Sequence, residues 1–405
     1  MATEATWEEL LGSKNWEGLL DPLNLSLRKL ILRCGNFCQG TYDAFDNDEI
    51  SKYAGSSRYG KKSFFRKVKL ESASDYQVQA FLYATAKVSF AQAIFMHSMS
   101  HDSWDQESNW IGYIAVTTDE VSKALGRREI YVAWRGTIRN YEWMNDLYDG
   151  LESIEELLHP EIVGIHRKVP KVMAGWLKLY VTSNPDSPFT KFSARTQVRA
   201  KIQELIDLYK DEKLSIVVTG HSLGASLATL SAFDLVENGI RDVPVAAVVF
   251  CSPHVGEEDF VDRVSKYPNL KVLHIKNKQD LVPAYPLEIL GFRNLGTTLE
   301  IDNAKSPNLK LSTNFFDWHN LEALLHTVAG WNGEEQAFEL KVKRSLALVN
   351  KSSGIIKDEY LIPSSWWMVE NKGMILDESN GEWILAPPDA EDLPEPESFS
   401  FEKLP

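Results

Sequence analysis

Ser222 stands at the centre of a Gly-x-Ser-x-Gly pattern that reads Gly220-His221-Ser222-Leu223-Gly224. A serine hydroxyl attacks an acyl carbonyl once a base removes its proton, and this pattern is typical of serines held at the tip of a sharp strand-to-helix turn. The two glycines suit such a turn because a Cβ atom beside the serine would not fit. We therefore predict that Ser222 is a nucleophile and that the Leu223 N–H faces the oxygen that becomes charged. The alternative is a glycine-rich turn with a surface serine.

The base that such a serine needs is usually a histidine, and the four histidines after Ser222 are His254, His274, His319 and His326. His274 lies inside an expected strand, and no candidate acid strand separates His254 from the serine. His319 comes at the start of an expected helix, where a loop can bring its ring to the serine. His326 lies two turns inside the same helix. We predict that His319 is the base and keep His326 as the alternative.

Asp280 is the acid that we expect to orient the base. It follows an expected strand, Leu270–Ile275, within a short loop, and in α/β hydrolases the chain order is serine, acid, histidine. It could instead be an Asx-turn aspartate ahead of Pro283. The competing acids lie in a helix-like stretch or in less regular regions: Asp259, Asp262, Asp302 and Asp317.

A second donor for the charged oxygen is expected in the loop after an earlier strand. The turn Arg135-Gly136-Thr137 follows the expected strand Glu129–Trp134. Gly136 allows a tight turn, and Thr137 offers its backbone N–H and its hydroxyl. The alternative is a simple strand-ending turn with Arg135 in a salt bridge.

Strands and helices that must position these residues alternate from about residue 110 to 280. Small and apolar residues from Ala225 onward and the amphipathic stretch Ser193–Lys210 predict helices. The alternation indicates an α/β fold with a mostly parallel sheet flanked by helices. Apolar runs predict its strands at Trp110–Thr117, Glu129–Trp134, Leu214–Val218, Val243–Cys251 and Leu270–Ile275.

Other segments give weaker patterns. Asp21 as N-cap and Pro22 as first residue predict a helix over 22–43 that packs on the core. Residues 118–128 read as a polar loop, and 172–181 as a helix or a strand. Residues 46–75 are expected to form an ordered surface segment, and the pattern of 81–95 is mixed. From Pro387 on, the chain is acidic and proline-rich and is expected to be loose.

Composition excludes several kinds of partner. The 405 residues include 43 basic and 57 acidic ones, a net charge of −14 without any basic run. This argues against nucleic acid and against electrostatic docking on anionic lipid. The three cysteines, Cys34, Cys38 and Cys251, are expected in the core rather than on a metal, and suit a reducing compartment. No apolar run could span a membrane, and the first residues resemble neither a signal nor a transit peptide, so we expect a cytoplasmic protein.

Five motifs in chain order resemble the class 3 (fungal-type) lipase family. They are Ala133-Trp134-Arg135-Gly136-Thr137, Gly220-His221-Ser222-Leu223-Gly224, Ser252-Pro253-His254-Val255-Gly256, Asp280-Leu281-Val282-Pro283 and His319-Asn320-Leu321-Glu322. The chain is still more similar to one plant branch, the class II phospholipase A1 proteins. That resemblance extends almost end to end, through Trp16–Asn24, Tyr42–Phe45, Leu348–Lys351 and Lys357–Trp367. One departure is Trp134, where fungal lipases usually have phenylalanine.

This resemblance implies an α/β-hydrolase fold with an N-terminal helical segment and a short lid. It implies hydrolysis of a glycerolipid acyl ester, typically at sn-1, by Ser222, Asp280 and His319. It assigns the oxyanion donors to Thr137 and Leu223, and a lid after Thr137 with Trp143 facing lipid. No metal or other cofactor is implied. The implied partners are a phospholipid, galactolipid or acylglycerol substrate and a transient membrane or micelle surface.

The whole chain, 1–405, is then expected to form a single lipase domain. Residues 1–100 would be the N-terminal helical and surface segment, and 101–335 the catalytic core. Residues 336–386 would be an extension packed on the core, and 387–405 the acidic tail. No feature indicates an oligomeric state.

Two other functions use the same residues. A binding or signalling protein can keep a lipase scaffold and act through partners, although known ones have a large extra helical domain after the core. An acyltransferase would pass the acyl group to an alcohol instead of water. Turnover of a p-nitrophenyl ester and analysis of products with an added acceptor separate these alternatives.

Overall fold

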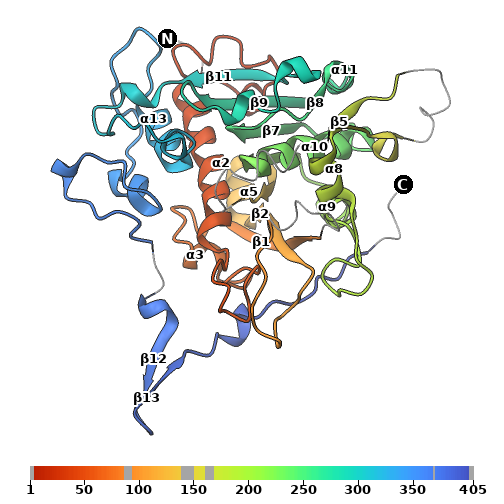
Figure 1. The fold of residues 1–405 in the computed structure, drawn as a ribbon. Coiled ribbons are helices and arrows are strands. Elements are labelled where there is room, and N and C mark those ends of the chain that lie inside the picture. The colour runs from red at the N-terminus through yellow and green to blue at the C-terminus, as the bar shows by residue number, and fades with distance from the viewer. Residues whose placement is uncertain (1–3, 86–93, 138–149, 160–167, 368–369, 401–405) are drawn as a thin grey trace.

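A central sheet of seven strands organises the computed structural model, which describes residues 4–85, 94–137, 150–159, 168–367 and 370–400 (Figure 1). From β3 to β11 all neighbours are parallel, whereas β1 and β2 are antiparallel to their neighbours. The expected mostly parallel sheet is therefore confirmed. In spatial order its strands are β1 (Tyr76–Ala84), β2 (Asn109–Thr117), β3 (Arg128–Trp134), β6 (Leu214–His221), β7 (Val245–Phe250), β9 (Leu270–Asn277) and β11 (Thr297–Ile301).

Strand β6 lies at the centre and is buried along its whole length. Successive side chains of a strand point to opposite faces of the sheet. Ile216 and Val218 accordingly join one apolar core, and Val217 joins the other. A strand with apolar residues on both faces is stable only between two layers of helices.

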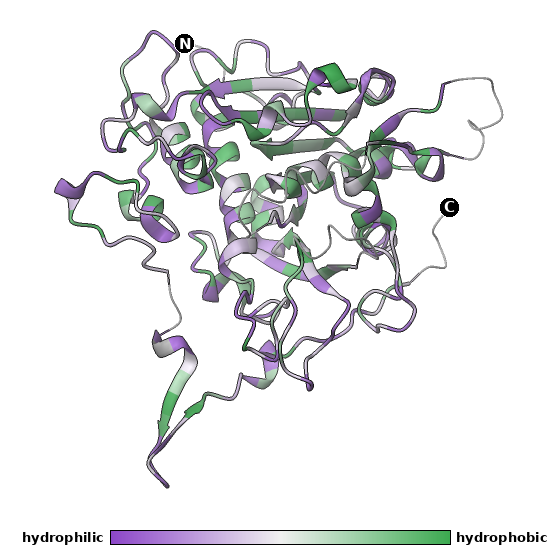
Figure 2. Ribbon diagram, in the orientation of Figure 1, coloured by the Kyte–Doolittle hydropathy of each residue, from purple (hydrophilic) through white to green (hydrophobic). Residues whose placement is uncertain are grey.

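Helices cover both faces of the sheet, and the apolar residues gather where they meet it (Figure 2). One core includes residues of α8, α9, α10 and α11, and the other includes residues of α2 and α13. The α-helices are α1 (Trp7–Leu10), α2 (Leu25–Asp43), α3 (Phe64–Lys67), α5 (Asp119–Leu125), α8 (Ala174–Val181), α9 (Ala194–Leu208), α10 (Leu223–Glu237), α11 (Glu258–Ser265), α12 (Phe315–Trp318) and α13 (Leu321–Gly330).

Two smaller sheets and several single turns complete the described chain. One sheet has the order β10 (Phe292–Arg293), β8 (Gly256–Glu257), β5 (Lys171–Met173) and β4 (Leu151–Ser153), and β12 (Met374–Asp377) pairs with β13 (Glu382–Leu385) in a hairpin that projects from the body (Figure 1). The 3₁₀ turns are η1 (Glu155–Leu157), η2 (Val282–Ala284), η3 (Glu288–Leu290), η4 (Asn303–Lys305), η5 (Leu346–Lys351), η6 (Asp358–Tyr360), η7 (Glu370–Gly373) and η8 (Ala390–Asp392). Within the described residues, no helix is both long and apolar enough to cross a bilayer.

Helix boundaries differ from the expected ones at two places, and capping explains both. Helix α2 begins at Leu25 rather than at Pro22, because the Asn24 side chain accepts hydrogen bonds from the N–H groups of Ser26 and Leu27. The loop expected over 118–128 contains α5. Thr118 caps that helix at its start, and Gly126 ends it with a φ of 66°. The segment 172–181 contains both expected types, since β5 leads directly into α8.

The acidic tail, expected to be loose, contacts the body between Asp389 and Glu397. Asp392 accepts a hydrogen bond of 2.8 Å from the Gly60 N–H and pairs with Lys67. Glu397 pairs with Lys61 at 2.6 Å and accepts a 3.0 Å hydrogen bond from the Phe81 N–H on the edge strand β1. Composition did not predict this contact because the basic partners lie more than 300 positions earlier in the chain.

Candidate active site

Ser222 lies between β6 and α10, at the tip of the predicted strand-to-helix turn. Its backbone has φ 59° and ψ −130°, a conformation that residues with a side chain rarely adopt. The Ser222 N–H donates to the Phe250 carbonyl at 3.0 Å, which ties the turn to β7. The side chain is 2% exposed, and its Oγ has no hydrogen-bond partner among the described residues. The fold therefore holds a strained serine with an uncommitted hydroxyl.

Glycines let three backbone segments meet at this turn. A Cβ on Gly220 would collide with the Gly224 carbonyl, and one on Gly224 would collide with the Trp134 carbonyl of β3. A Cβ on Gly136 would lie 2.6 Å from the His221 carbonyl. The turn after β3 thus packs directly on the turn that bears Ser222, and the glycines expected to allow each sharp turn also allow this close approach.

Asp280 and His319 are joined by a hydrogen bond of 2.6 Å between Oδ2 and Nδ1. Both side chains are buried. Oδ1 of Asp280 accepts from the Val282 N–H at 2.9 Å, so the residue makes an Asx turn as well. The two interpretations of Asp280 in the sequence are therefore compatible, since each describes one carboxylate oxygen.

The position of His319 follows from two helices that meet there. It is the C-cap of α12, and Asn320 caps the start of α13 by accepting from the Ala323 N–H. The Asn277 side chain at the end of β9 donates to the Trp318 carbonyl at 2.9 Å and fastens this corner to the sheet. A histidine at such a corner presents its ring to the carboxyl edge of the sheet.

The other histidines that follow Ser222 have different partners. His326 lies within α13 and is hydrogen-bonded to the Ser306 hydroxyl at 2.9 Å. His274 accepts the Ser252 N–H at 3.0 Å, and His254 is hydrogen-bonded to the Pro286 carbonyl. Burial lowers the pKa of His274 to about 3 and that of His326 to about 4. These three histidines therefore make structural hydrogen bonds within the core and its loops.

Competing carboxylates are likewise engaged elsewhere. Asp259 and Asp262 lie on α11. Asp302 accepts from the Gln279 side chain, and Asp317 accepts from the Ser312 hydroxyl.

His221 links the turn to His319 through a relay that the sequence analysis missed. The Tyr42 hydroxyl lies 2.8 Å from His221 Nδ1, and His221 Nε2 lies 3.0 Å from the His319 carbonyl. A carbonyl only accepts, so Nε2 carries the proton and Nδ1 accepts from Tyr42. Burial lowers the pKa of His221 well below its usual value, which keeps the ring neutral. Tyr42 belongs to the segment Tyr42–Phe45, one of those that resemble the plant class II phospholipase A1 proteins. Nothing in the sequence indicated that it contacts His221.

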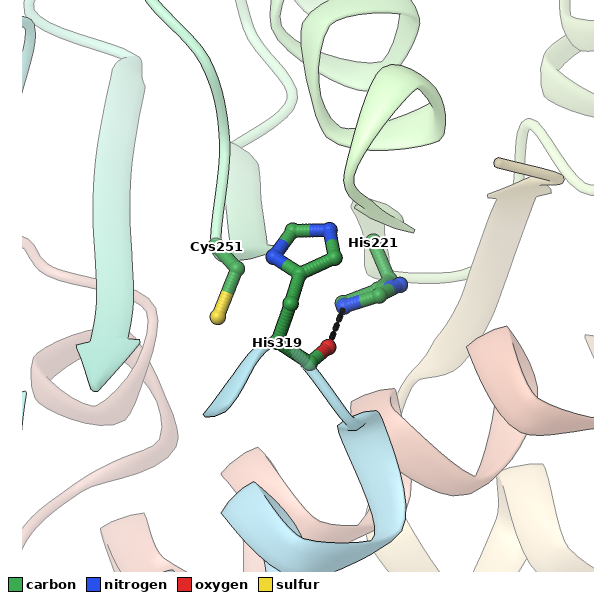
Figure 3. Close-up of side chains that lie close together, drawn as sticks. All are labelled: His221, Cys251 and His319. Carbon is green, nitrogen blue, oxygen red and sulfur yellow. Dashed lines mark hydrogen bonds between the residues drawn. The ribbon is translucent and has the colours of Figure 1, made fainter. Parts of the chain in front are cut away.

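Cys251 is a second residue that the sequence analysis placed only in the core. Burial, and next the Asp280 carboxylate to which its thiol is hydrogen-bonded, raise the pKa of Cys251 well above its usual value. Ligand atoms of His221, Cys251 and His319 lie within 4.8 Å of one another (Figure 3). A metal would require a thiolate and free ring nitrogens. The protonated thiol and the hydrogen-bonded His221 ring fit a hydrogen-bond network better than a metal site.

Arg135 holds the turn that precedes Thr137, and among the described residues its contacts are with backbone groups and an aromatic ring rather than the salt bridge considered above. Its guanidinium donates to the carbonyls of Trp110 and Gly136 at 3.0 and 2.9 Å and stacks 3.8 Å from the Phe45 ring centre. Burial lowers the pKa of Arg135 to about 9. Thr137 then lies on the wall of the cleft that Ser222 and His319 also line.

This cleft has a volume of about 1300 Å³ and is open to solvent. That size exceeds the 300–1,000 Å³ typical of small-molecule sites. Aromatic residues, among them Phe316 and Trp366, line it together with charged ones. Trp143, the residue expected to face lipid, lies outside the described residues.

Comparison with known proteins identifies the family of this chain. The family model described as Lipase (class 3) matches residues 131–289. Phospholipase A1-IIdelta of Arabidopsis thaliana is 57% identical over 98% of this chain and 100% of its own length. The chain belongs to the class II phospholipase A1 family. Phospholipase A1-II 5 of Oryza sativa subsp. japonica is 50% identical over 96% of this chain and 84% of its own.

Among solved structures, the native propeptide complex of Rhizomucor miehei lipase has a TM-score of 0.42 and 18% identity, over 74% of this chain and 71% of that chain. The matched family region contains Ser222 and Asp280 but ends before His319. In this member of the class II phospholipase A1 family, the place of His319 therefore rests on its hydrogen bond to Asp280.

Proposed function

We propose that this protein cleaves the sn-1 acyl ester of glycerolipids, with Ser222 as nucleophile, His319 as base and Asp280 as the acid that orients it. As a family member, the protein is a carboxylic ester hydrolase that acts on lipid esters. The assignment of these three roles is best supported by the buried Asp280–His319 hydrogen bond, because His319 and the strained Ser222 line the same cleft.

In the first half of the reaction, His319 Nε2 accepts the Ser222 proton while Oγ forms a bond to the ester carbonyl carbon. The N–H groups of Leu223 and Thr137 stabilise the oxyanion. The carbon–oxygen bond to the glycerol then breaks, and the leaving alkoxide takes the proton back from His319. A lysolipid departs and the fatty acyl group stays on Ser222.

In the second half, His319 takes a proton from water, and the hydroxide oxygen attacks the acyl carbonyl. Collapse releases the fatty acid and returns the proton to Ser222 Oγ. Asp280 fixes the Nδ1–H tautomer of His319 throughout and stabilises the imidazolium that forms in each half.

The protein would meet its substrate at a membrane or micelle surface and work in the cytoplasm. The three cysteines are free and buried, as suits a reducing compartment. Fractionation of native cells that express a tagged chain tests this cytoplasmic location. Recovery of the chain in a secreted or organelle fraction would contradict it.

A phosphatidylcholine with different acyl chains at sn-1 and sn-2 tests the function. The wild type should release the sn-1 chain, and Ser222→Ala should lower that rate by at least about 10⁴-fold without unfolding the protein. Release at an undiminished rate would refute the nucleophile. Turnover of neither this lipid nor a p-nitrophenyl ester would favour a binding protein, and acyl transfer to added glycerol in place of fatty acid release would favour a transferase.

A further inference from the structure

The cleft at Ser222 is opposite in charge to the chain as a whole. Five basic side chains line it against three acidic ones, Asp43, Asp48 and Asp317. The full sequence has 43 basic and 57 acidic residues. Sequence composition argued against nucleic acid and against electrostatic docking on anionic lipid, whereas the fold gathers cations on the walls of one cleft.

Three of these five cations have carboxylate partners. Arg58 pairs with Asp46 at 3.0 Å. Lys67 pairs with the acidic tail, at 3.1 Å from Asp389 and also with Asp392. Lys351 pairs with Asp43.

The other two, Lys69 and Lys372, have no carboxylate within 4 Å among the residues that the structure describes. Both are exposed on the cleft, so their charge is available to a ligand.

Two of the lysines, Lys351 and Lys69, lie close to the Trp367 ring. The Lys351 ammonium lies 4.0 Å from the centre of the Trp367 ring, and the Lys69 ammonium lies 6.0 Å from it. Lys351 is buried and fixed by its ion pair with Asp43. Lys69, beside the Trp367 ring, and Lys372 are the two cations without a carboxylate partner among the described residues, and they line the cleft that also holds the nucleophile. We call these two lysines, together with Trp367, the cationic wall.

We propose that this cationic wall, formed by Lys69 and Lys372 in the cleft that Trp367 also lines, binds the phosphate of a glycerophospholipid while its sn-1 ester lies at Ser222. The inference rests on the proposed function and refines its substrate class. A phosphodiester offers oxygens to two ammonium groups at once, and such charge-assisted hydrogen bonds are strong. A galactolipid or diacylglycerol has no charge to offer this wall.

The test compares phosphatidylcholine with p-nitrophenyl butyrate, an ester without a headgroup. In Lys69→Gln/Lys372→Gln, kcat/KM for phosphatidylcholine in neutral detergent micelles should fall about tenfold, while that for the p-nitrophenyl ester stays unchanged. Lys123→Gln/Lys266→Gln, two exposed lysines outside the cleft, should leave both rates unchanged. Lys69→Arg/Lys372→Arg should retain most phosphatidylcholine turnover.

An equal fall on both substrates, or no fall on either, would overturn the proposal. A site for free phosphate would behave differently. The glutamine variant would keep its phosphatidylcholine turnover and lose inhibition of the p-nitrophenyl ester by inorganic phosphate, which also overturns the headgroup assignment. If the wild type turns over the p-nitrophenyl ester but does not cleave phosphatidylcholine, the protein is an esterase that does not act on this phospholipid. In that case the proposed function itself is wrong.

Discussion

Ser222, His319 and Asp280 come from three different loops, and single hydrogen bonds tie His319 to Asp280 and to His221, the neighbour of Ser222. His319 is held on both sides, by Asp280 at its ring and by His221 at its carbonyl. His221 depends in turn on Tyr42. A base that must alternate between accepting and returning a proton benefits from such restraint, because a small misplacement lowers the rate steeply.

Replacing Tyr42 by phenylalanine should therefore affect catalysis as well as stability. The His221 Nδ1 would lose its donor inside the protein, which costs about 1–3 kcal/mol of unfolding free energy. We expect kcat for a p-nitrophenyl ester to fall roughly tenfold because His319 loses part of its support. The measurement is steady-state kinetics together with chemical denaturation.

Tyr113→Phe is the matched control for this change. Tyr113 also donates a buried hydrogen bond, to the Phe37 carbonyl at 2.9 Å, and that carbonyl belongs to α2 rather than to the site. The Tyr113→Phe variant should lose about as much unfolding free energy as Tyr42→Phe and should keep the wild-type kcat. Equal kcat values in the two variants would show that the relay has only a structural role.

Buried neutral histidines give a prediction for pH. The pKa of His274 is lowered to about 3 in the folded protein and is near 6.5 when unfolded. Between these values the unfolded chain binds more protons, so stability is complete above pH 6.5 and declines as pH falls. The slope is up to ~1.4 kcal/mol per pH unit for each such histidine.

His274→Gln keeps an acceptor for the Ser252 N–H but cannot titrate. Thermal unfolding from pH 7.5 to 4.5 should show a shallower decline for this variant than for the wild type. His101→Gln, which removes a histidine at an exposed position, should leave the slope as it is. Parallel curves for all three proteins would contradict the role of His274.

At the scale of elements, the glycine turn after β3 determines how closely Thr137 approaches Ser222. Gly136→Ala places a methyl group against the Tyr42 hydroxyl and the His221 carbonyl, so the turn must move. Loss of one oxyanion donor lowers kcat by about 10²- to 10³-fold, and we expect a loss of this size. Kinetics with a p-nitrophenyl ester would measure it.

Gly126→Ala provides the comparison, because Gly126 has φ 66° and open space around its missing Cβ. It should cost about 1 kcal/mol of unfolding free energy and leave kcat unchanged. If both variants keep full activity, the turn after β3 does not position a donor.

The acidic tail is an element whose contact can be weakened without altering Ser222, Asp280 or His319. Asp392→Asn with Glu397→Gln removes the Asp392–Lys67 and Glu397–Lys61 pairs and leaves the Asp389–Lys67 pair. We expect residues 389–400 to exchange amide hydrogens faster and to be cut first by protease. Glu395→Gln, on an exposed tail residue, should change neither. Protection that persists in the double variant would mean that the Lys67–Asp389 pair and packing on Gly60 are enough to hold the tail.

How far the sequence predicted these elements depends on whether their signals are local. Strands β6, β7 and β9 were predicted because each is an apolar run, and the order of serine, acid and histidine left few candidates for the site. The helix α5 was missed although its caps, Thr118 and Gly126, are visible in the sequence. The contact between Tyr42 and His221 joins residues 179 positions apart. Patterns of neighbouring residues cannot predict a contact between residues so far apart in the sequence.

For the whole molecule, the question is how an acidic protein reaches lipid. The loops that bear Asp280 and His319 expose large apolar side chains: Ile289 is 89% exposed and Phe315 is 59% exposed. The Asp280–His319 hydrogen bond joins these loops, so their apolar residues flank one site. Exposed apolar groups of this size can enter the boundary region of a lipid surface without help from charge.

Ile289→Gln with Phe315→Gln should therefore weaken association with vesicles and spare the chemistry. On a Ser222→Ala background, we expect the partition coefficient onto neutral phosphatidylcholine vesicles in a sedimentation assay to fall about tenfold. With Ser222 intact, p-nitrophenyl ester turnover should remain at the wild-type rate. Leu125→Gln with Leu208→Gln, on α5 and α9, replaces two apolar side chains that are 38% and 63% exposed and lie away from these loops, and should leave partitioning unchanged. Equal partitioning of both double variants would exclude these loops as the contact, and the hairpin β12–β13, with Trp383 61% exposed, would be the next surface to alter.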